Sequence, residues 1–388
     1  MQIRRALIAT AAVAATVLAA GTASAADPSQ FRPPADSLRA IASAINLRVG
    51  TAVTPFELDN AAYTKITGDQ FSTVTPGNEM KWQVVEPTRG TYDWSAADRL
   101  VTFAQQHGQL VRGHTLVWHN QLPNWLTSGV ADGSINNDQL RALLHKHITD
   151  EVTHFKGKIW QWDVANEFFI NAWEPNALPD GINADNFWVS HLGEGILADA
   201  FRWAHQADPK ALLVYNDFNI GGEDGTNLKA DYAYNWAKNM IAQGVPIQGI
   251  GVQGHLDTQY GYSGSRLADD LARYATLGVK VAMTEADVRT FVNNATEQVP
   301  TSNLALFAQP YEYIQMLRAC LEVRECISFT VWGFGDANSW VPGFFTGEGY
   351  ACIYDVNLNP KQAYTDMQHE LMLARKGAQR RANSGHDD

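Results

Sequence analysis

Short β-rich segments alternate with amphipathic helical segments along most of the chain. The segments rich in β-branched and apolar residues are 47–52, 71–75, 110–117, 159–165, 211–216, 247–253, 280–284 and 327–332. Helical periodicity predicts helices between them, including 96–107, 137–155, 195–207, 230–243, 265–277 and 304–321. Strands that alternate with helices of this length form βαβ units and a parallel sheet. Eight units in about 330 residues predict an α/β fold, a closed (β/α)8 TIM barrel, with an open doubly wound sheet as the alternative.

The two ends of the chain differ in composition from this alternating part. Arg4 and Arg5, a short apolar run and Ala23-Ser24-Ala25 predict that residues 1–25 are a secretory signal peptide, cleaved near Ala25. We therefore expect a secreted, extracellular protein. No Gly/Ser- or Pro-rich linker divides the rest, so 26–373 is expected to be a single barrel domain. The polar tail, 374–388, is expected to be frayed.

The charge balance narrows the class of partner. The formal net charge is −12, and becomes −14 without residues 1–25, which carry two Arg and no acidic residue. An acidic chain is a poor ligand for nucleic acid or an anionic membrane, both of which need a basic face. We therefore expect a neutral or weakly charged partner, with the protein acting as a monomer.

Cysteine and histidine spacing gives no sign of a metal site. Cys320 and Cys326 are six residues apart, a spacing that one short loop can close with a disulfide in an exported protein, which leaves Cys352 as a buried free thiol. No CxxC or HExxH pattern is present. His145 and His147 diverge around a helix and are expected in solvent. We predict neither a metal nor another cofactor.

Polar and aromatic residues gather where the predicted strands end. Catalytic residues of a barrel lie at this edge, because the carboxyl ends of all its strands meet there. One carboxylate at such a place often only caps the next helix, but a whole ring is hard to explain as caps. The ring consists of Asn78, Glu79, Lys81, Trp82, His114, Trp118, His119, Asn166, Glu167, Asn216, Asp217, Gln253, His255, Glu285, Asp287, Trp332 and Asp336.

Two carboxylates of this ring, Glu167 and Glu285, follow the fourth and seventh predicted strands, which lie nearly opposite in an eight-stranded barrel. Hydrolysis of a glycosidic bond needs a carboxylic acid on one side and a carboxylate on the other. A gap of about 5–5.5 Å gives retention through a covalent glycosyl-enzyme, and a gap above about 6.5 Å gives inversion. The sequence therefore predicts a glycoside hydrolase with this catalytic pair.

The neighbours of the two carboxylates indicate their roles. Asp287 lies two residues beyond Glu285 and faces the same side of an extended chain. With His255 it can form an Asp–His–Glu hydrogen-bond chain that keeps Glu285 ionised, as a nucleophile requires. Glu167 follows an aromatic strand, and apolar surroundings favour the protonated form that a general acid needs. Asn166 can bond a sugar 2-hydroxyl, a contact that strengthens in the transition state.

These segments resemble glycoside hydrolase family 10, the barrel xylanases, from about Ser37 to Tyr364. The motifs that carry the resemblance are LRVGTAV at 47–53, NEMKWQVVEPTRGTYDW at 78–94, GHTLVWHNQLPNW at 113–125, WDVANE at 162–167, YNDFNI at 215–220, GVQGHL at 251–256, TEAD at 284–287 and TVWGFGDANSW at 330–340. The resemblance implies a secreted retaining endo-1,4-β-xylanase without a cofactor. Such an enzyme hydrolyses internal bonds of plant cell-wall xylan by double displacement.

Carried over position by position, the resemblance implies Glu167 as acid/base and Glu285 as nucleophile, oriented by His255 and Asp287. Positions that line the family's glycone subsites match Asn78, Lys81, His114, Trp118, Asn166 and Gln253. Aromatic walls of the sugar nearest the cut match Trp332 and Trp340, and residues that crowd a hexose hydroxymethyl group match Gln121 and Trp340. A disulfide common in the family matches Cys320–Cys326.

The chain departs from the family pattern at the glycone end. The family usually carries Glu immediately before the Asn of NEMKW, whereas this chain has Gly77, and Val341 replaces a frequent basic residue after Trp340. An altered distal pocket is compatible with a tomatinase-like enzyme or another β-glycosidase of the family, acting on a related plant glycoside.

Two interpretations from other classes fit the sequence less well. A non-catalytic sugar-binding barrel is expected to have lost one of the two carboxylates, and this chain keeps both. A barrel that uses a metal or phosphate cofactor needs a ligand cluster or a phosphate-binding loop, and the glycine-rich stretch 221–225 contains Glu223 and Asp224, which repel phosphate.

Overall fold

Parallel strands close into a barrel in the computed structural model, which describes residues 31–171 and 174–384. The barrel strands are β1 (Arg48–Val53), β2 (Thr73–Pro76), β3 (Leu110–Val117), β4 (Ile159–Asn166), β5 (Leu212–Asp217), β6 (Gly249–Val252), β8 (Lys280–Phe291) and β9 (Cys326–Val331). Each pairs in parallel with the next, and β9 returns to pair with β1, with Arg48 opposite Ser328. The predicted (β/α)8 barrel is confirmed, and the open sheet is wrong.

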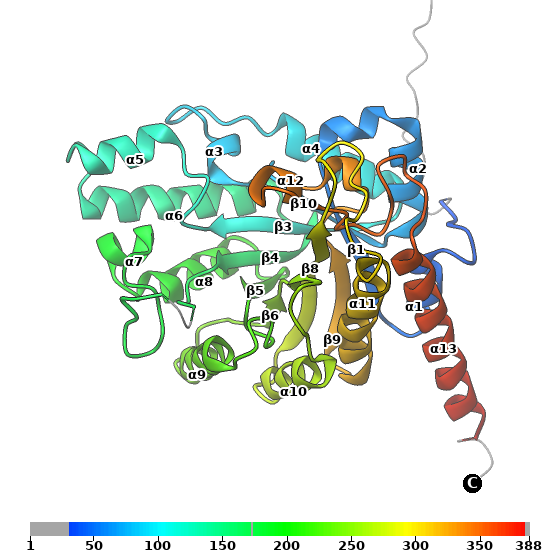
Figure 1. Cartoon of the computed structure of the whole chain (residues 1–388). Helices are drawn as coiled ribbons and strands as arrows, with labels where there is room; N and C mark the ends of the chain where they lie inside the picture. The colour runs from blue at the N-terminus through cyan, green and yellow to red at the C-terminus, as the bar shows by residue number, and fades with distance from the viewer. Residues whose placement is uncertain (1–30, 172–173, 385–388) are drawn as a thin grey trace, which may run out of the picture.

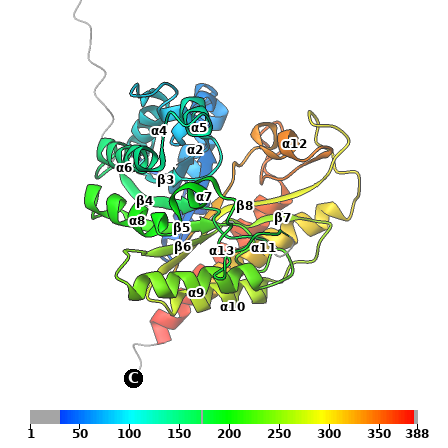
Figure 2. The same cartoon turned by 90° about the vertical axis from the view of Figure 1, so that its left-hand side faces the viewer.

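Helices occupy the connections between the strands and lie outside the barrel (Figures 1 and 2). They are α1 (Leu38–Ser43), α2 (Ala61–Gln70), α3 (Trp82–Val85), α4 (Ser95–Gln106), α5 (Asn124–Ala131), α6 (Asn137–His154), α7 (Phe187–Leu192), α8 (Ile196–Ala207), α9 (Leu228–Ala242), α10 (Gly264–Ala275), α11 (Ala305–Glu322) and α12 (Val341–Phe344). Local sequence sets their ends; α6, for example, begins at a capping box in which Asn136 and Gln139 exchange two 2.9 Å hydrogen bonds.

Strand β8 is longer than the sequence predicts. The expected strand ends at Thr284, whereas β8 continues to Phe291 because two further strands pair with its extension. These are β7 (His255–Asp257), parallel, and β10 (Glu348–Gly349), antiparallel. Gly254 joins β6 to β7 with a φ of +81°, and a Cβ there would lie 2.7 Å from the Met283 side chain, so this link requires glycine. The extension places Glu285 and Asp287 inside a paired strand.

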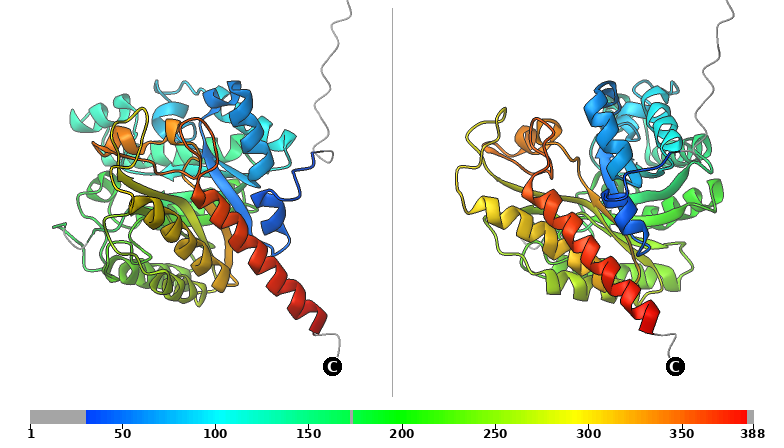
Figure 3. Two further views of the ribbon diagram at one scale, coloured as in Figure 1. Left: turned by 45° about the vertical axis from the view of Figure 1, so that its right-hand side comes forward. Right: turned by 90° about the vertical axis from the view of Figure 1, so that its right-hand side faces the viewer.

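The last helix ties the two ends of the described chain together. Helix α13 (Gln362–Ser384) packs against α1 and α11 (Figure 3). The side chain of Gln368 donates a 2.7 Å hydrogen bond to the carbonyl of Asp36. The tail expected to fray from Ala374 continues this helix to Ser384, because its Ala, Lys, Arg and Gln residues are good helix formers.

Three predictions about single side chains can be compared with the structure. The Cys320–Cys326 disulfide is confirmed, with a Cα–Cα distance of 5.4 Å, and Cys352 is a buried free thiol as predicted. The prediction that His147 lies in solvent is wrong. It faces the buried side of α6 and stacks on Trp82, with ring centroids 3.9 Å apart. No helix within 31–171 or 174–384 is long and apolar enough to cross a membrane.

Candidate active site

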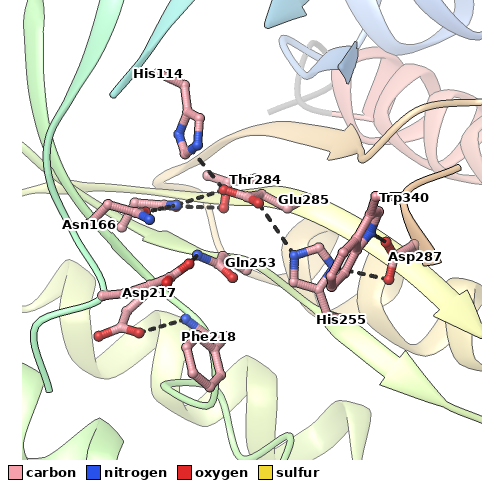
Figure 4. Close-up of polar contacts among 12 residues, drawn as sticks. His114, Asn166, Asp217, Phe218, Gln253, His255, Thr284, Glu285, Asp287 and Trp340 are labelled. Atoms are coloured by element: carbon pink, nitrogen blue, oxygen red, sulfur yellow. Dashed lines mark hydrogen bonds and ion pairs between the residues drawn. The ribbon is translucent and has the colours of Figure 1, made fainter. Parts of the chain in front are cut away.

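Much of the predicted polar ring gathers at the carboxyl end of the barrel, but Trp82 is buried against His147 and Asp336 pairs with Lys361. Glu167 directly follows β4, Glu285 and Asp287 lie in β8, His255 begins β7, and His114 lies in β3. Figure 4 shows Glu285 between His114 and His255, with Trp340 beside Asp287. Side chains from strands far apart in the sequence therefore share one site.

Glu285 is surrounded by positively charged and hydrogen-bond-donating groups. Its Oε1 accepts a 2.8 Å hydrogen bond from Asn216, and its Oε2 lies 3.3 Å from His255 Nε2. The Arg112 guanidinium lies 3.5 Å from Oε1. Burial alone would raise the pKa of Glu285, but the charge of His114, the hydrogen bond from His255 and the charge of Arg112 hold it far below its usual range. Glu285 is therefore ionised throughout the neutral and mildly acidic range.

The predicted Asp287–His255–Glu285 chain is present. His255 Nδ1 lies 2.9 Å from Asp287 Oδ1, and the indole N–H of Trp340 donates a 2.7 Å hydrogen bond to the other oxygen of Asp287. Burial acts to lower the pKa of His255, but the Asp287 and Glu285 carboxylates raise it to about 10. At neutral pH the imidazole therefore donates to both carboxylates.

A second buried network, which the sequence analysis did not foresee, supports Glu285 from β3. Arg112 forms an ion pair with Asp163 and donates a 2.9 Å hydrogen bond to the carbonyl of Thr284. His114 Nδ1 lies 2.8 Å from Asp163 Oδ2. The signal was available: Arg112 interrupts the otherwise apolar start of β3, and a charge inside a barrel strand needs a buried partner.

Among the described residues, His114, Asp163 and Glu285 offer ligand atoms within 4.8 Å of one another, as a metal site would. The Arg112 guanidinium already contacts both of these carboxylates. Its fixed positive charge opposes a cation at the same place. The donor set does not fit a metal ion, and we assign none to it.

Glu167 has a different environment. Its carboxylate accepts 2.8 Å hydrogen bonds from the indole N–H of Trp118 and from the side-chain amide of Gln253, both neutral groups. One of the aromatic residues of the strand before it, Trp160, packs against Arg48. Glu167 also has a φ of +60°, a left-handed conformation that is unusual for a residue with a side chain.

Asn166 keeps a donor free for a ligand. Its Oδ1 accepts a 2.8 Å hydrogen bond from Asn216, whereas its Nδ2 is buried and has no hydrogen-bond partner within the described ranges. A buried donor without a partner costs about 1–3 kcal/mol. A sugar hydroxyl at this position would remove that cost.

The predicted glycone residues form a compact polar group. Lys81 Nζ donates to Asn78 Oδ1 at 3.1 Å and to Gln121 Oε1 at 2.7 Å, and it lies 4.8 Å from the centre of the Trp118 ring. Burial lowers the pKa of Lys81 to about 8, against the raising effect of Glu285 and Glu167. Lys81 is therefore close enough to both carboxylates to respond to their charge.

The two predicted aromatic walls lie against different histidines of the site. The Trp332 ring is 5.2 Å from that of His114, and the Trp340 ring is 5.1 Å from that of His255. Both indoles are partly exposed. The site thus has an aromatic surface on each flank of Glu285.

The two departures from the family pattern have different structural consequences. A Cβ at Gly77 would meet only Thr54 and the carbonyl of Val53, at 3.7 and 3.9 Å, so the backbone there leaves room for a larger side chain. Val341 is fully buried at the start of α12 and offers the rim no side chain.

Comparison with known proteins gives one consistent result. Residues 37–370 match the sequence model of glycosyl hydrolase family 10. The chain is 40% identical over 317 residues to an endo-1,4-beta-xylanase of Agaricus bisporus, covering 81% of this chain and 88% of that protein. It is 36% identical to endo-1,4-beta-xylanase B of Thermotoga neapolitana, covering 86% and 91% of the two chains. The crystal structure of xylanase 10B from Thermotoga petrophila with xylobiose is similar in fold, with a TM-score of 0.79, 34% identity and coverage of 87% and 98%.

Proposed function

The chain belongs to glycosyl hydrolase family 10, and on this premise we propose that it is a retaining endo-1,4-β-xylanase with Glu167 as acid/base and Glu285 as nucleophile. The observation that carries this assignment is that Gln253 contacts both residues. Its carbonyl accepts a 2.9 Å hydrogen bond from the Glu285 amide, and its side chain donates to Glu167 at 2.8 Å. Gln253 thus links the backbone of Glu285 to the carboxylate of Glu167.

The proposed reaction has two steps. In the first, a Glu285 oxygen attacks the anomeric carbon of a xylose unit, the glycosidic C–O bond breaks, and Glu167 gives its proton to the leaving oxygen. In the second, Glu167 takes a proton from water, the water oxygen attacks the anomeric carbon, and the bond to Glu285 breaks. Two inversions give net retention and restore both carboxyl groups.

Other residues of the site bind and orient the sugar in this proposal. The free Nδ2 of Asn166 donates to the 2-hydroxyl, a contact that strengthens as the anomeric carbon becomes positive. The group formed by Asn78, Lys81 and Gln121 contacts glycone hydroxyls. Trp332 and Trp340 enclose the ring nearest the cut, and Gln121 and Trp340 crowd the position of a hexose hydroxymethyl group.

The test is a substrate panel: birchwood xylan, carboxymethylcellulose and α-tomatine, with products identified by chromatography and mass spectrometry. The proposal predicts xylobiose and xylotriose from xylan and nothing from the cellulose derivative. Early proton NMR of the products is expected to show the β-anomer before mutarotation. Initial release of the α-anomer contradicts retention, and inactivity on xylan contradicts the xylanase assignment.

A tomatinase-like activity is the second candidate, and Gly77 is the observation that favours it. Loss of the usual Glu removes a charge-assisted hydrogen bond to a distal xylose, at a cost of about 1–3 kcal/mol in glycone binding. Because the backbone at Gly77 has room for a Cβ, the variant Gly77→Glu tests whether a glutamate here restores binding of the distal xylose. If the protein is a xylanase, the Gly77→Glu variant should have a lower KM for long xylo-oligosaccharides than the wild type, with the same kcat. Release of an intact tetrasaccharide from tomatine, with no gain on xylan, favours the second candidate.

We further propose that the enzyme is exported, with residues 1–25 removed near Ala25, and that it acts as a monomer on plant cell-wall xylan outside the cell. Residues 1–30 lie outside the described part of the chain, so support comes from their Arg pair, apolar run and Ala-x-Ala site. N-terminal sequencing of protein from the culture medium tests the cleavage site. Light scattering on the purified protein tests the monomer.

A further inference from the structure

The backbone at Glu167 is held in a conformation that it would not adopt alone. With a φ of +60°, Glu167 lies in the left-handed region, which is unfavourable for a residue that has a Cβ. Such a conformation persists only where the surrounding structure determines it. The groups that hold this backbone therefore set the direction of the Glu167 side chain.

Three consecutive amides at this point donate to three consecutive residues of β5. The amide of Glu167 donates to the carbonyl of Asn216 at 3.0 Å. The amide of Phe168 donates to the hydroxyl of Tyr215 at 3.0 Å, and the amide of Phe169 to Asp217 Oδ2 at 3.4 Å. Only the first is an ordinary backbone contact. The other two depend on side chains.

These two side chains depend in turn on a buried lysine. The hydroxyl of Tyr215 donates to Asp217 Oδ2, and Lys229 Nζ forms a 2.8 Å ion pair with Asp217 Oδ1. Lys229 also donates to Asn171 at 3.3 Å and lies 3.6 Å from the centre of the Phe218 ring. Burial raises the pKa of Asp217 to about 6 and the Lys229 charge opposes that rise, so Lys229 favours the ionised acceptor.

Tyr215, Asp217 and Lys229 have fully buried side chains, so they do not touch a sugar in the site. Their contacts lead instead to the two residues that follow Glu167. We propose that Tyr215, Asp217 and Lys229 are positioning residues for the acid/base, which fix the Glu167 turn and thereby aim its carboxyl group at the leaving oxygen. This inference rests on the proposed function.

The inference predicts a selective defect. An aryl xylobioside with a phenol leaving group needs a proton from Glu167, whereas 2,4-dinitrophenolate leaves without one. For both substrates kcat/KM reports the formation of the glycosyl-enzyme. If the Glu167 carboxyl group is misplaced, kcat/KM for the phenyl substrate should therefore fall, while kcat/KM for the dinitrophenyl substrate should not. General loss of structure slows both equally.

The primary variant is Tyr215→Phe, which removes one hydroxyl and keeps the ring. We expect kcat/KM for phenyl β-xylobioside to fall about 10- to 100-fold, the range associated with misplacement of a catalytic group, and kcat/KM for the dinitrophenyl substrate to change less than about two-fold. Tyr274→Phe is the matched control, because that hydroxyl is equally buried and bonds the carbonyls of Ile220 and Ala230. The control is expected to retain wild-type rates on both substrates.

A double variant tests whether Tyr215 affects the rate through Glu167. In a Glu167→Ala background, Tyr215→Phe is expected to change the phenyl rate by less than about two-fold, because the group it positions is gone. Equal losses on both substrates, or a full additional loss in the Glu167→Ala background, overturn the inference. If Tyr215→Phe fails to fold, Lys229→Met takes its place with the same expected pattern. Failure of the wild type to hydrolyse either xylobioside overturns the proposed function instead.

Discussion

Arg112 and His255 place positive charge next to Glu285, beside the neutral donor Asn216, whereas both hydrogen-bond donors to Glu167 are neutral. Arg112, His114 and His255 surround Glu285, which lies inside a paired strand. The contacts of Glu167 are the indole of Trp118 and an amide, and its backbone turns out of the strand in a left-handed conformation. Two residues of one type, at one end of one barrel, thus have opposite environments.

The difference matches what the proposed reaction requires of Glu285 and of Glu167. A nucleophile must stay ionised, and fixed positive charges stabilise the carboxylate form without being consumed. An acid/base gains and loses a proton in every cycle, so strong stabilisation of either form would slow one step. Four predictions test this contrast, in order of expected effect.

Removing Glu285 is expected to have the largest effect. Glu285→Ala deletes the proposed nucleophile and should lower kcat on xylan by about 10⁵-fold or more, on the scale seen when a hydrolase loses its covalent nucleophile. Xylotriose binding, measured by calorimetry, should remain. Glu312→Ala is the control, because Glu312 is also a buried glutamate but lies on α11. Unchanged hydrolysis by Glu285→Ala would falsify the nucleophile assignment.

Removing Glu167 should be milder and depend on the substrate. Glu167→Ala is expected to lower kcat/KM on xylan about 10²- to 10⁴-fold, the usual contribution of a general acid. Dinitrophenyl xylobioside should lose little in kcat/KM, because its leaving group needs no proton. Azide needs no general base, so it should restore turnover and give a β-xylobiosyl azide detectable by NMR. An α-azide, or equal losses on both substrates, contradicts the assignment.

Removing the positive charge of Arg112 near Glu285 should change the pH dependence of kcat/KM. The Arg112 charge contributes to the lowered pKa of Glu285, so Arg112→Met should raise that pKa and move the acidic limb of the kcat/KM profile to higher pH. At a fixed acidic pH on that limb, kcat/KM should fall about 10-fold for every pH unit that the limb moves. Arg112→Lys keeps the charge and should move the limb less. Identical profiles for the two variants contradict the electrostatic explanation.

The smallest effect concerns stability. The folded pKa of His255 is about 10, above the unfolded value of about 6.5. Protonated His255 therefore stabilises the fold fully below about pH 6.5, and this contribution disappears as the pH rises towards 10. The melting temperature of His255→Gln should lie a few degrees below wild type at pH 6, with a gap that narrows by pH 10. A gap that does not change with pH rules out this linkage.

Local patterns made much of the fold predictable. The strand and helix periods predicted the barrel, and polar residues at strand ends predicted where Glu167, His255 and Glu285 meet. Arg112 was missed although its charge in an apolar strand was a usable signal; only the identity of its partner Glu285, 173 residues away, lay beyond any local pattern. The β8 extension was missed for a related reason, since the strands β7 and β10 that pair with it are short and come from other loops.

Two other misses had a usable local signal. His147 falls on the same helical stripe as Leu140 and Leu144, so the period of α6 already placed it inside. The polar composition after Ala374 was interpreted as fraying, although the same residues favour helix. In both cases the polar character of the residues suggested exposure or fraying, whereas their place in a helical pattern determined the structure.

Closure of the barrel by its first and last strands has a consequence for synthesis. Strand β1 cannot pair with β9 until the roughly 270 residues between them have left the ribosome, which takes about 15–55 s at typical elongation rates. Throughout that interval one edge of β1 has no partner, and such edges are templates for pairing with other chains. A nascent chain halted before Cys326 therefore keeps this edge exposed and should aggregate more readily than the full-length protein.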